Sequence, residues 1–157
     1  LNNLPYNEML IDSSESFNQK SWSRWVNKKI ATTIPGSLEF LNYVESKNVE
    51  LIYLSNRRIE NFIPTKDNLV SLGYPFHENT IMLLRDETSD KTKRRNSLFD
   101  FEIIMLLGDN LSDFSSVFYK KSNKERIKNV DSLSNHFGQK FIVLPNLIYG
   151  DWEYGFE

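Results

Sequence analysis

The sequence predicts an α/β fold built on a doubly wound parallel sheet, because short apolar runs alternate with amphipathic segments. The apolar runs have the length of buried strands and lie at 50–54, 80–84, 103–107 and 140–144. Helical patterns separate them, at 15–30, 35–47, 65–72, 89–98, 114–119 and 124–137. The first fourteen residues contain Pro5 and little periodicity, so they are predicted to form a loop.

The composition is that of a single globular domain. The 157 residues are 39% hydrophobic and 25% charged, and the net charge is −2. The densest basic stretch is 91–95, which is too short for a nucleic-acid-binding face. The sequence has neither an apolar run of membrane-spanning length nor a signal-peptide pattern, and the absence of cysteine excludes disulfides and thiolate sites.

The most informative stretch begins with the apolar run 103–107 and ends in Gly108-Asp109-Asn110-Leu111-Ser112-Asp113. In open α/β sheets, ligands bind beyond the carboxyl ends of the strands. Asp109 lies at such an end, and Asp113 follows in the predicted first turn of a helix. Two carboxylates there suit Mg²⁺, which prefers oxygen ligands. Helix capping explains the same residues equally well, so this stretch alone does not decide between the two interpretations.

Polar residues also follow the other predicted strands. Ser55 and Asn56 follow 50–54, where a hydroxyl, an amide and backbone N–H groups can bind a phosphoryl group. Turn chemistry alone is the favoured explanation of that pair. Lys91 lies in the basic helix after 80–84, where one lysine can turn inward to neutralise a phosphate.

Three further features have structural explanations. Trp22 and Trp25 share a helix face; core packing is favoured, and an aromatic wall over a ligand is the alternative. Thr65 is the predicted N-cap of its helix, with Gly73 after its end. The isolated His77 and His136 receive no functional role.

The order of hydroxyl, lysine and Gly-Asp-x-x-x-Asp resembles the second, third and fourth motifs of the haloacid dehalogenase superfamily. Blocks over nearly the whole chain are similar to the class C acid phosphatases, bacterial surface lipoproteins that often act as 5′-nucleotidases. These blocks are 20–26, 34–36, 53–57, 108–114 and 144–153. The resemblance implies a haloacid dehalogenase-like, Rossmann-type fold over 1–157 with a small helical cap contributed by about residues 1–33.

The resemblance also implies roles for the site residues. Ser55 and the Asn56 backbone would hold the phosphoryl group, and Lys91 would neutralise it. Asp109 would bind Mg²⁺, and Asp113 would act on Lys91 or on a metal-bound water. These roles agree with the interpretation of the strand ends given above.

A second set of residues would bind the nucleoside. Trp22 and Tyr149 match family aromatics that line the base pocket, and the tail from 149 to 154 is rich in aromatic residues. Lys93 remains an alternative to Lys91 as the phosphate lysine. The implied substrate is a nucleoside 5′-monophosphate or another phosphomonoester, and homodimerisation remains open.

The family's first motif, Asp-x-Asp-x-Thr, carries the nucleophile and the general acid/base, and these 157 residues do not contain it. Asp12 is no substitute, because no apolar strand precedes it. We expect the nucleophile upstream of Leu1 in the full-length protein, together with a lipid anchor at the bacterial surface or outer membrane, and we expect these residues alone to be inactive. The alternatives are a non-catalytic nucleotide-binding surface protein and a purely structural domain.

Overall fold

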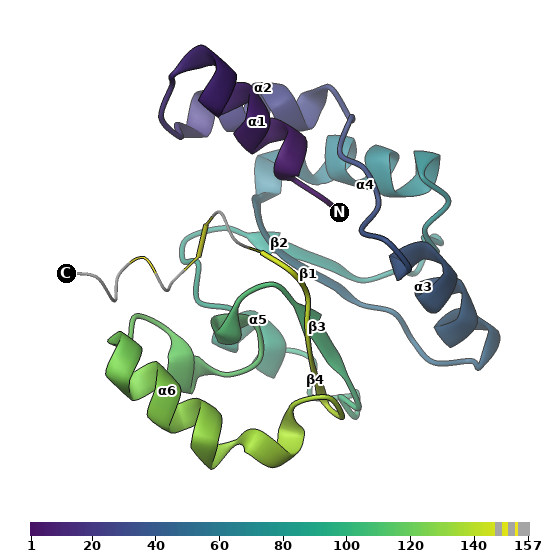
Figure 1. Cartoon of the computed structure of the whole chain (residues 1–157). Coiled ribbons are helices and arrows are strands. Elements are labelled where there is room, and N and C mark those ends of the chain that lie inside the picture. Colours follow the sequence, from purple (N-terminus) through teal and green to yellow (C-terminus); the bar gives the residue numbers. More distant parts are fainter. Residues whose placement is uncertain (147–148, 151–152, 154–157) are drawn as a thin grey trace. The chain divides into compact units, whose positions relative to one another are not determined.

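The computed structural model describes residues 1–146, 149–150 and 153. The chain divides into two compact units, Leu1–Glu87 and Thr88–Glu157 (Figure 1). Asp151, Trp152 and Tyr154, which belong to the predicted aromatic tail, lie outside the described residues. The assignment of 1–157 to a single domain stays a prediction.

The first unit combines helices with a parallel strand pair. Its elements are α1 (Leu4–Ser13), α2 (Gln19–Asn27), α3 (Ser37–Ser46), β1 (Tyr53–Arg58), the 3-10 turn η1 (Ile59–Asn61), α4 (Phe62–Ser71) and β2 (Met82–Arg85). Tyr53 lies opposite Met82 and Leu54 opposite Leu83, and the register then shifts before Arg58 pairs with Arg85. The irregular part of β1 therefore contains Ser55 and Asn56.

The predicted loop over the first fourteen residues is wrong, because α1 occupies most of it. Pro5 lies in the first turn, where a helix needs no backbone N–H from it. Tyr6 and Leu10 are four residues apart and both buried, so they form the apolar face. Two buried positions are too sparse a pattern to be recognised beside a proline.

The packing of α1 against α2 forms the first core of this unit. Tyr6, Leu10, Trp25, Val26 and Ala31 are buried there, and Trp22 packs against them. The Tyr6 and Ser21 hydroxyls share a hydrogen bond of 2.7 Å inside this core. The prediction that Trp25 is a core residue is confirmed, since it is 2% exposed.

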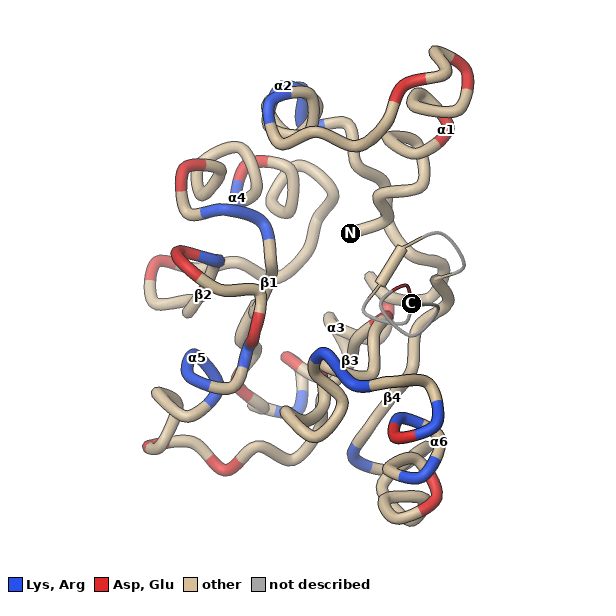
Figure 2. Tube along the Cα trace, turned by 90° about the vertical axis from the view of Figure 1, so that its left-hand side faces the viewer, with Lys and Arg blue, Asp and Glu red and all other residues tan. Residues whose placement is uncertain are grey.

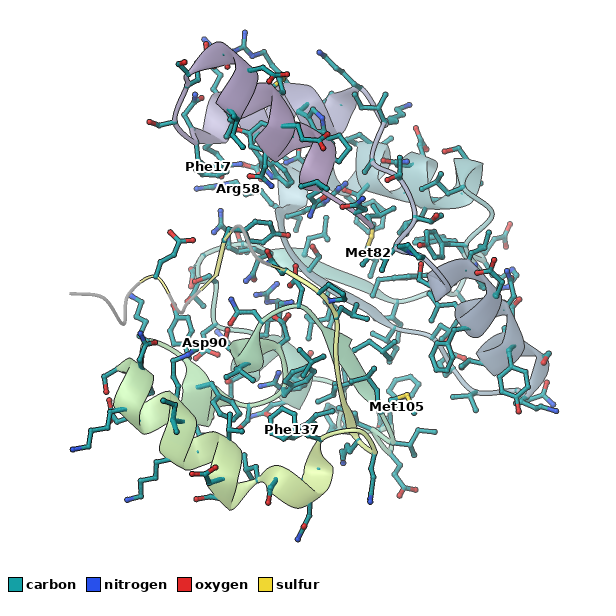
Figure 3. All side chains as sticks on the ribbon, in the orientation of Figure 1. Phe17, Arg58, Met82, Asp90, Met105 and Phe137 are labelled. Atoms are coloured by element: carbon teal, nitrogen blue, oxygen red, sulfur yellow. The ribbon has the colours of Figure 1, made fainter. Side chains whose placement is uncertain are left out.

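A second core lies between the strand pair and the helices α3 and α4. Leu69 of α4 packs with Tyr74, Met82 and Leu84, and Leu38 of α3 adds to the same cluster. Met82 is labelled in Figure 3. Tyr53 of β1 also borders it and donates its hydroxyl to the Pro75 carbonyl at 2.7 Å. Burial raises the pKa of the Tyr53 phenol to about 12, so it stays a donor at neutral pH.

The buried amide of Asn68 joins α4 to the loop after α2. It accepts from the Ala31 N–H at 3.1 Å and donates to the Ala31 carbonyl at 3.0 Å. Asn68→Ala leaves both backbone groups buried without this partner, and we expect it to cost about 2–3 kcal/mol of unfolding free energy. Urea denaturation measures this loss, with the exposed Asn79→Ala as the matched control. Equal midpoints for the two variants would contradict the role of Asn68.

The second unit contains shorter elements. They are α5 (Thr92–Asn96), β3 (Leu106–Gly108), the 3-10 turns η2 (Leu111–Asp113) and η3 (Ser116–Phe118), α6 (Asn123–Ser132), the 3-10 turn η4 (Ser134–His136) and β4 (Phe141–Val143). The strands β3 and β4 are parallel, with Leu106 opposite Phe141 and Gly108 opposite Val143. Phe114, Phe118 and Phe141 are buried, and Phe114 stacks on Phe141 at 5.1 Å between ring centroids.

Several predicted boundaries in this unit are wrong. The run 103–107 forms strand only from Leu106, and Ile104 and Leu107 are 57% and 40% exposed instead of buried. In the part of the chain that the structure describes, β3 pairs with one strand, β4, which covers one of its two edges. The helix predicted at 114–119 is a single 3-10 turn, and the helix predicted at 89–98 is reduced to α5.

Two helices of the first unit also begin elsewhere than predicted. Instead of starting at residue 15, α2 starts after Asn18, whose side chain accepts from the Ser21 N–H at 2.8 Å. The predicted N-cap Thr65 lies inside α4, where it is 3% exposed. The start of α4 was predicted too late because proline is usually found outside helices. Pro64 instead lies in the first turn of α4, where a helix tolerates a proline. The prediction for α3, opened by Gly36, is confirmed.

None of the helices among the described residues combines the length and apolar character that a membrane span requires.

Candidate active site

The turn after β3 gathers the residues that the sequence singled out in the second unit. Asn110 caps η2 by accepting from the Ser112 N–H, and Asp113 Oδ2 accepts from the Asn110 N–H at 3.1 Å. This reciprocal arrangement is a capping box. The capping interpretation is therefore correct for Asn110 and Asp113, and it does not exclude function, because the same box fixes the position of Asp109.

Lys91 lies beside this turn. Its Nζ is 2.8 Å from Asp113 Oδ1, and the two side chains are only 12% and 11% exposed. The sequence left open whether Lys91 or Lys93 binds the phosphate. Lys93 is exposed, whereas Lys91 lies beside the turn 108–113, which is called the acidic turn below. A nearly buried ammonium held by a carboxylate is a preorganised positive charge.

Gly108 explains how Asp113 can fold back onto the end of β3. A Cβ atom at position 108 would lie 2.5 Å from Asp113 Cβ and 2.6 Å from its Oδ2. Gly108→Ala must therefore displace Asp113, and we expect a loss of about 1–3 kcal/mol in unfolding free energy, as for other overpacked sites. We also expect Gly108→Ala to lower the phosphatase activity that the resemblance implies for the full-length protein. Thermal unfolding and phosphate release measure the two effects, and unchanged activity would show that the position of Asp113 is not critical.

Asp109 accepts two hydrogen bonds from the segment after β4. Asn146 Nδ2 and the Tyr149 hydroxyl each donate to Asp109 Oδ2 at 3.0 Å. Burial raises the pKa of the Asp109 carboxyl, and the charge of Asp113 raises it further, whereas the Tyr149 hydroxyl and Lys91 oppose the rise. A carboxylate whose charge is disfavoured by burial and by a second carboxylate is a place where a cation is stabilising.

The residues present fit a divalent cation such as Mg²⁺. Mg²⁺ is commonly held by one or two carboxylates and keeps several waters. Asp109 supplies one carboxylate, and Asp113 lies close enough to raise its pKa. Over residues 1–146, 149–150 and 153, no cluster of three or more His, Asp or Glu suitable for a metal is found, so Asp109 provides only part of a ligand set. His77, which forms an exposed pair with Glu45, is not part of it.

The predicted phosphoryl-binding pair lies in the first unit. Ser55 and Asn56 are inside β1, in its irregular part, and not beyond its end as predicted. The Arg57 N–H donates to Ser55 Oγ at 3.1 Å, so the hydroxyl is held by its own strand. Ser55 is half-buried and Asn56 is exposed. The boundary was misplaced because a bulged strand tolerates the polar residues that usually signal a turn.

Trp22 belongs to an aromatic cluster of the first unit. Its ring stacks on Trp25 at 5.3 Å and lies edge-on to Tyr6 at 4.9 Å between centroids. The Arg57 guanidinium lies 5.6 Å from the Trp22 ring centroid, and Trp22 itself is half-buried. The cluster thus serves as core, as favoured from the sequence, and leaves part of Trp22 accessible.

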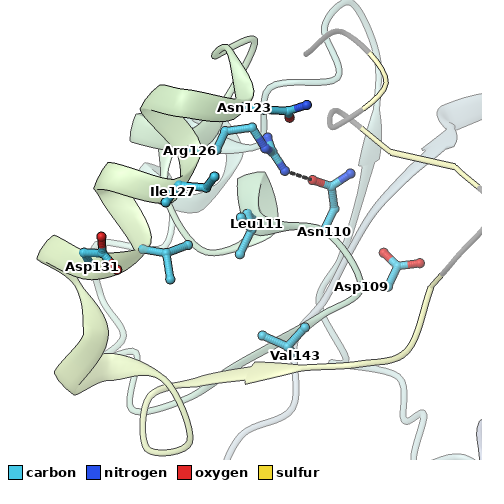
Figure 4. Close-up of a pocket in the computed structure, with 9 residues that line it drawn as sticks. Asp109, Asn110, Leu111, Asn123, Arg126, Ile127, Asp131 and Val143 are labelled. Carbon is cyan, nitrogen blue, oxygen red and sulfur yellow. Dashed lines mark hydrogen bonds between the residues drawn. The ribbon is translucent and has the colours of Figure 1, made fainter. Parts of the chain in front are cut away.

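A cavity of about 500 Å³ lies beside the acidic turn, between α6 and the ends of β3 and β4 (Figure 4). Arg126, 5% exposed, crosses it and donates to Asn110 Oδ1 at 3.4 Å and to the Phe118 carbonyl at 2.8 Å. Asp109 is at its edge, whereas Ile127, Val130 and Val143 make the wall apolar.

Sequence reasoning missed Arg95, Arg126 and Asn146. Arg95 lies four residues after Lys91, a spacing that places both on one helix face and that was available as a signal. Asn146 lies in a block that resembles class C acid phosphatases but received no role. For Arg126, one arginine in a polar helix, the sequence carries no signal that distinguishes it from a solvated residue.

Comparisons with known proteins identify the family of the chain. A family model described as HAD superfamily, subfamily IIIB (acid phosphatase), matches residues 1–152. The chain belongs to this acid phosphatase family. The solved class C acid phosphatase from Bacillus anthracis superposes with a TM-score of 0.91 at 38% identity, over 99% of this chain and 65% of that one. Its tungstate-bound form gives a TM-score of 0.89 at 37% identity, with the same coverage of both chains.

Two plant proteins are among the curated proteins with similar sequences. The stem 31 kDa glycoprotein of Glycine max is 28% identical over 95% of this chain and 55% of its own length. Acid phosphatase 1 of Solanum lycopersicum is 28% identical over 76% of this chain and 51% of its own length. The chain thus spans about half the length of the curated relatives that it matches.

The family assignment confirms the predicted fold class, and the family is one of acid phosphatases, which is the enzyme class predicted from the sequence. Acid phosphatases of this superfamily are metal-dependent in general. The roles of Ser55, Asn56, Lys91, Asp109 and Asp113 stay predictions.

Proposed function

We propose that the full-length protein is a Mg²⁺-dependent acid phosphatase that hydrolyses nucleoside 5′-monophosphates through an aspartyl-phosphate intermediate. The observation that carries this proposal is the pairing of Lys91 with Asp113 beside Asp109, at the end of a parallel strand. An ammonium group and a carboxylate that is not its ion-pair partner thus lie close together, and this supports a site in which one neutralises phosphate charge and the other binds a metal.

In this proposal each residue contributes a distinct electrostatic or positioning effect. Asp109 holds the metal, which when bound polarises the phosphoryl oxygens. The Lys91 ammonium, oriented by Asp113, neutralises phosphate charge. Ser55 Oγ, which accepts from the Arg57 N–H, is proposed to donate its own proton to a phosphoryl oxygen. The resemblance implies that the nucleophile and the general acid/base come from an Asp-x-Asp-x-Thr motif, which is not among these 157 residues.

The nucleotide specificity is proposed from two aromatic residues. Trp22 is half-buried and so remains partly accessible. The Tyr149 hydroxyl donates to Asp109, so in this proposal Tyr149 lies beside the residue that binds the metal. Stacking on aromatic rings accepts every nucleobase. By resemblance we also propose a lipid-anchored location at the bacterial surface or periplasm; this is tested by fractionating membranes and labelling the lipid.

The test is phosphate release by the full-length protein from adenosine 5′-monophosphate, p-nitrophenyl phosphate and glucose 6-phosphate, each with Mg²⁺ or with a chelator. We expect Mg²⁺-dependent turnover of all three and the lowest KM for the nucleotide. Nucleotide binding without phosphate release would instead indicate a non-catalytic nucleotide-binding protein. Equal KM values for all three substrates would contradict the nucleotide specificity.

Tyr149 offers a separate prediction for the nucleoside. Tyr149→Ala removes the ring and the hydroxyl, whereas Tyr149→Phe removes only the hydrogen bond to Asp109. If the ring stacks on the base, Tyr149→Ala raises the KM for adenosine monophosphate about 10-fold and leaves that for p-nitrophenyl phosphate nearly unchanged. Tyr149→Phe serves as the control and keeps the nucleotide KM low. Equal effects of Tyr149→Ala on both substrates would refute base stacking.

A further inference from the structure

The short helix α5 is rich in basic residues (Figure 2). Lys91, its N-cap residue, and Arg95 both contact Asp113 of the acidic turn. Lys91 and Arg95 are joined by a backbone hydrogen bond, from the Arg95 N–H to the Lys91 carbonyl at 2.8 Å, and so lie one turn apart on the same face. Lys91 contacts the Asp113 carboxylate. Arg95 Nη1 donates to the Asp113 backbone carbonyl at 2.6 Å. One helix face therefore holds both the side chain and the main chain of Asp113.

The two contacts have different consequences. The Lys91 contact orients charges that the proposed chemistry uses directly. The Arg95 contact fixes the peptide at the end of η2, a single 3-10 turn. Hydrogen bonds in 3-10 helices are in general less well aligned than those in α-helices, so a turn of this kind gains from an additional contact. Because Asp113 Oδ2 in turn holds the Asn110 N–H at 3.1 Å, the position of the Asp109–Asn110 peptide depends on where Asp113 is held.

We propose that Arg95 is a positioning residue that sets the geometry of the acidic turn and thereby the metal affinity of Asp109 and the placement of Lys91. The role rests on the proposed function of this turn. It is consistent with the half-buried position of Arg95, which places its guanidinium between α5 and the turn instead of in solvent. Displacing reacting groups by about 1 Å can cost about 100-fold in rate, so a remote clamp of this kind has a measurable effect.

The neighbouring Arg94 is a matched control. Its guanidinium donates to the Thr88 carbonyl at 3.3 Å and the Asp90 carbonyl at 3.4 Å, in the loop that precedes α5. Asp90, labelled in Figure 3, accepts from the Thr92 N–H at 2.9 Å in the same loop. Arg94→Met and Arg95→Met thus remove the same charge from the same helix but break contacts with different segments.

The experiment compares the full-length protein with Arg94→Met, Arg95→Met and Arg95→Lys in three measurements. Calorimetric titration gives the Mg²⁺ affinity, hydrogen exchange gives the protection of the 108–114 backbone, and steady-state kinetics with p-nitrophenyl phosphate give kcat and KM. For Arg95→Met we expect a Mg²⁺ affinity lower by about 10-fold, faster exchange at 108–114, and a kcat lower by about 10–100-fold that excess Mg²⁺ partly restores. Arg94→Met should stay within about two-fold of the parent.

The conservative variant separates positioning from general stability. Arg95→Lys keeps the charge and one donor, so it should recover part of the exchange protection and of the metal affinity, and it covers the case in which Arg95→Met does not fold. The proposal is overturned if Arg95 variants lower only the unfolding midpoint, with metal affinity and exchange at 108–114 like those of Arg94→Met. An inactive parent protein would refute the proposed phosphatase function, whereas exchange and metal titration would still decide the role of Arg95.

Discussion

Replacing Asp109 by Asn should lower the phosphatase activity of the full-length protein by more than about 100-fold, since even the outer partners of metal ligands are worth 10–100-fold. The substitution keeps the shape of the side chain and its capacity to accept from Asn146 and Tyr149, but it removes the charge that binds the cation. The effect should therefore fall on metal binding. Activity as a function of Mg²⁺ concentration measures it.

We also expect Asp109→Asn to change how pH and Mg²⁺ affect the stability of the folded protein. Burial and Asp113 raise the pKa of Asp109, so the ionised carboxylate destabilises the metal-free folded state as the pH rises through that pKa. Asp109→Asn should thus leave the metal-free protein as stable at neutral pH, or more so, and abolish stabilisation by Mg²⁺. The exposed Asp100→Asn is the control and should keep the Mg²⁺-induced rise in Tm. A full Mg²⁺ effect in Asp109→Asn would exclude Asp109 as a ligand.

Replacing Lys91 by Met should lower kcat/KM by about 10²–10³-fold, the range for removing one preorganised electrostatic group. It should also destabilise the protein by about 3 kcal/mol, because the nearly buried Asp113 carboxylate loses its ion-pair partner. Lys93→Met, on the exposed side of the same helix, removes an equal charge and should change neither quantity appreciably.

The double variant Lys91→Met, Asp113→Asn, which keeps an oxygen able to accept from the Asn110 N–H, separates the two effects of Lys91. It removes the unpaired carboxylate and should regain much of the stability without regaining activity. If Lys93→Met proved the more damaging single variant, the assignment of the phosphate lysine would be wrong. Unfolding midpoints and kcat/KM, measured on the same preparations, give the stability effect and the activity effect of each variant.

The sequence predicted those parts of the fold that depend on local patterns. The helix opened by Gly36 was correct, since its apolar periodicity and start signal agree. The first helix was missed because Pro5 looks like a breaker and only Tyr6 and Leu10 form its buried face. The strand β1 was placed too early because its irregular register puts Ser55 and Asn56 inside the strand.

The acidic turn could be predicted to the extent that its residues are close in sequence. Gly108, Asp109 and Asp113 form a compact motif, and the structure adds the reason for the glycine, the close approach of Asp113. The hydrogen bond from Arg95 to the Asp113 carbonyl joins residues 18 positions apart in the sequence, and that from Asn146 to Asp109 joins residues 37 positions apart. Such contacts follow from how the segments pack, which a single sequence does not specify.

The most direct test of the central claim is phosphate release from adenosine 5′-monophosphate by the purified full-length protein of verified intact mass, as Mg²⁺ is titrated after removal of metal by a chelator. We predict that phosphate release is absent without metal, appears in proportion to bound Mg²⁺, and disappears in Asp109→Asn. Release at an undiminished rate in the presence of the chelator, or in Asp109→Asn, would contradict this prediction.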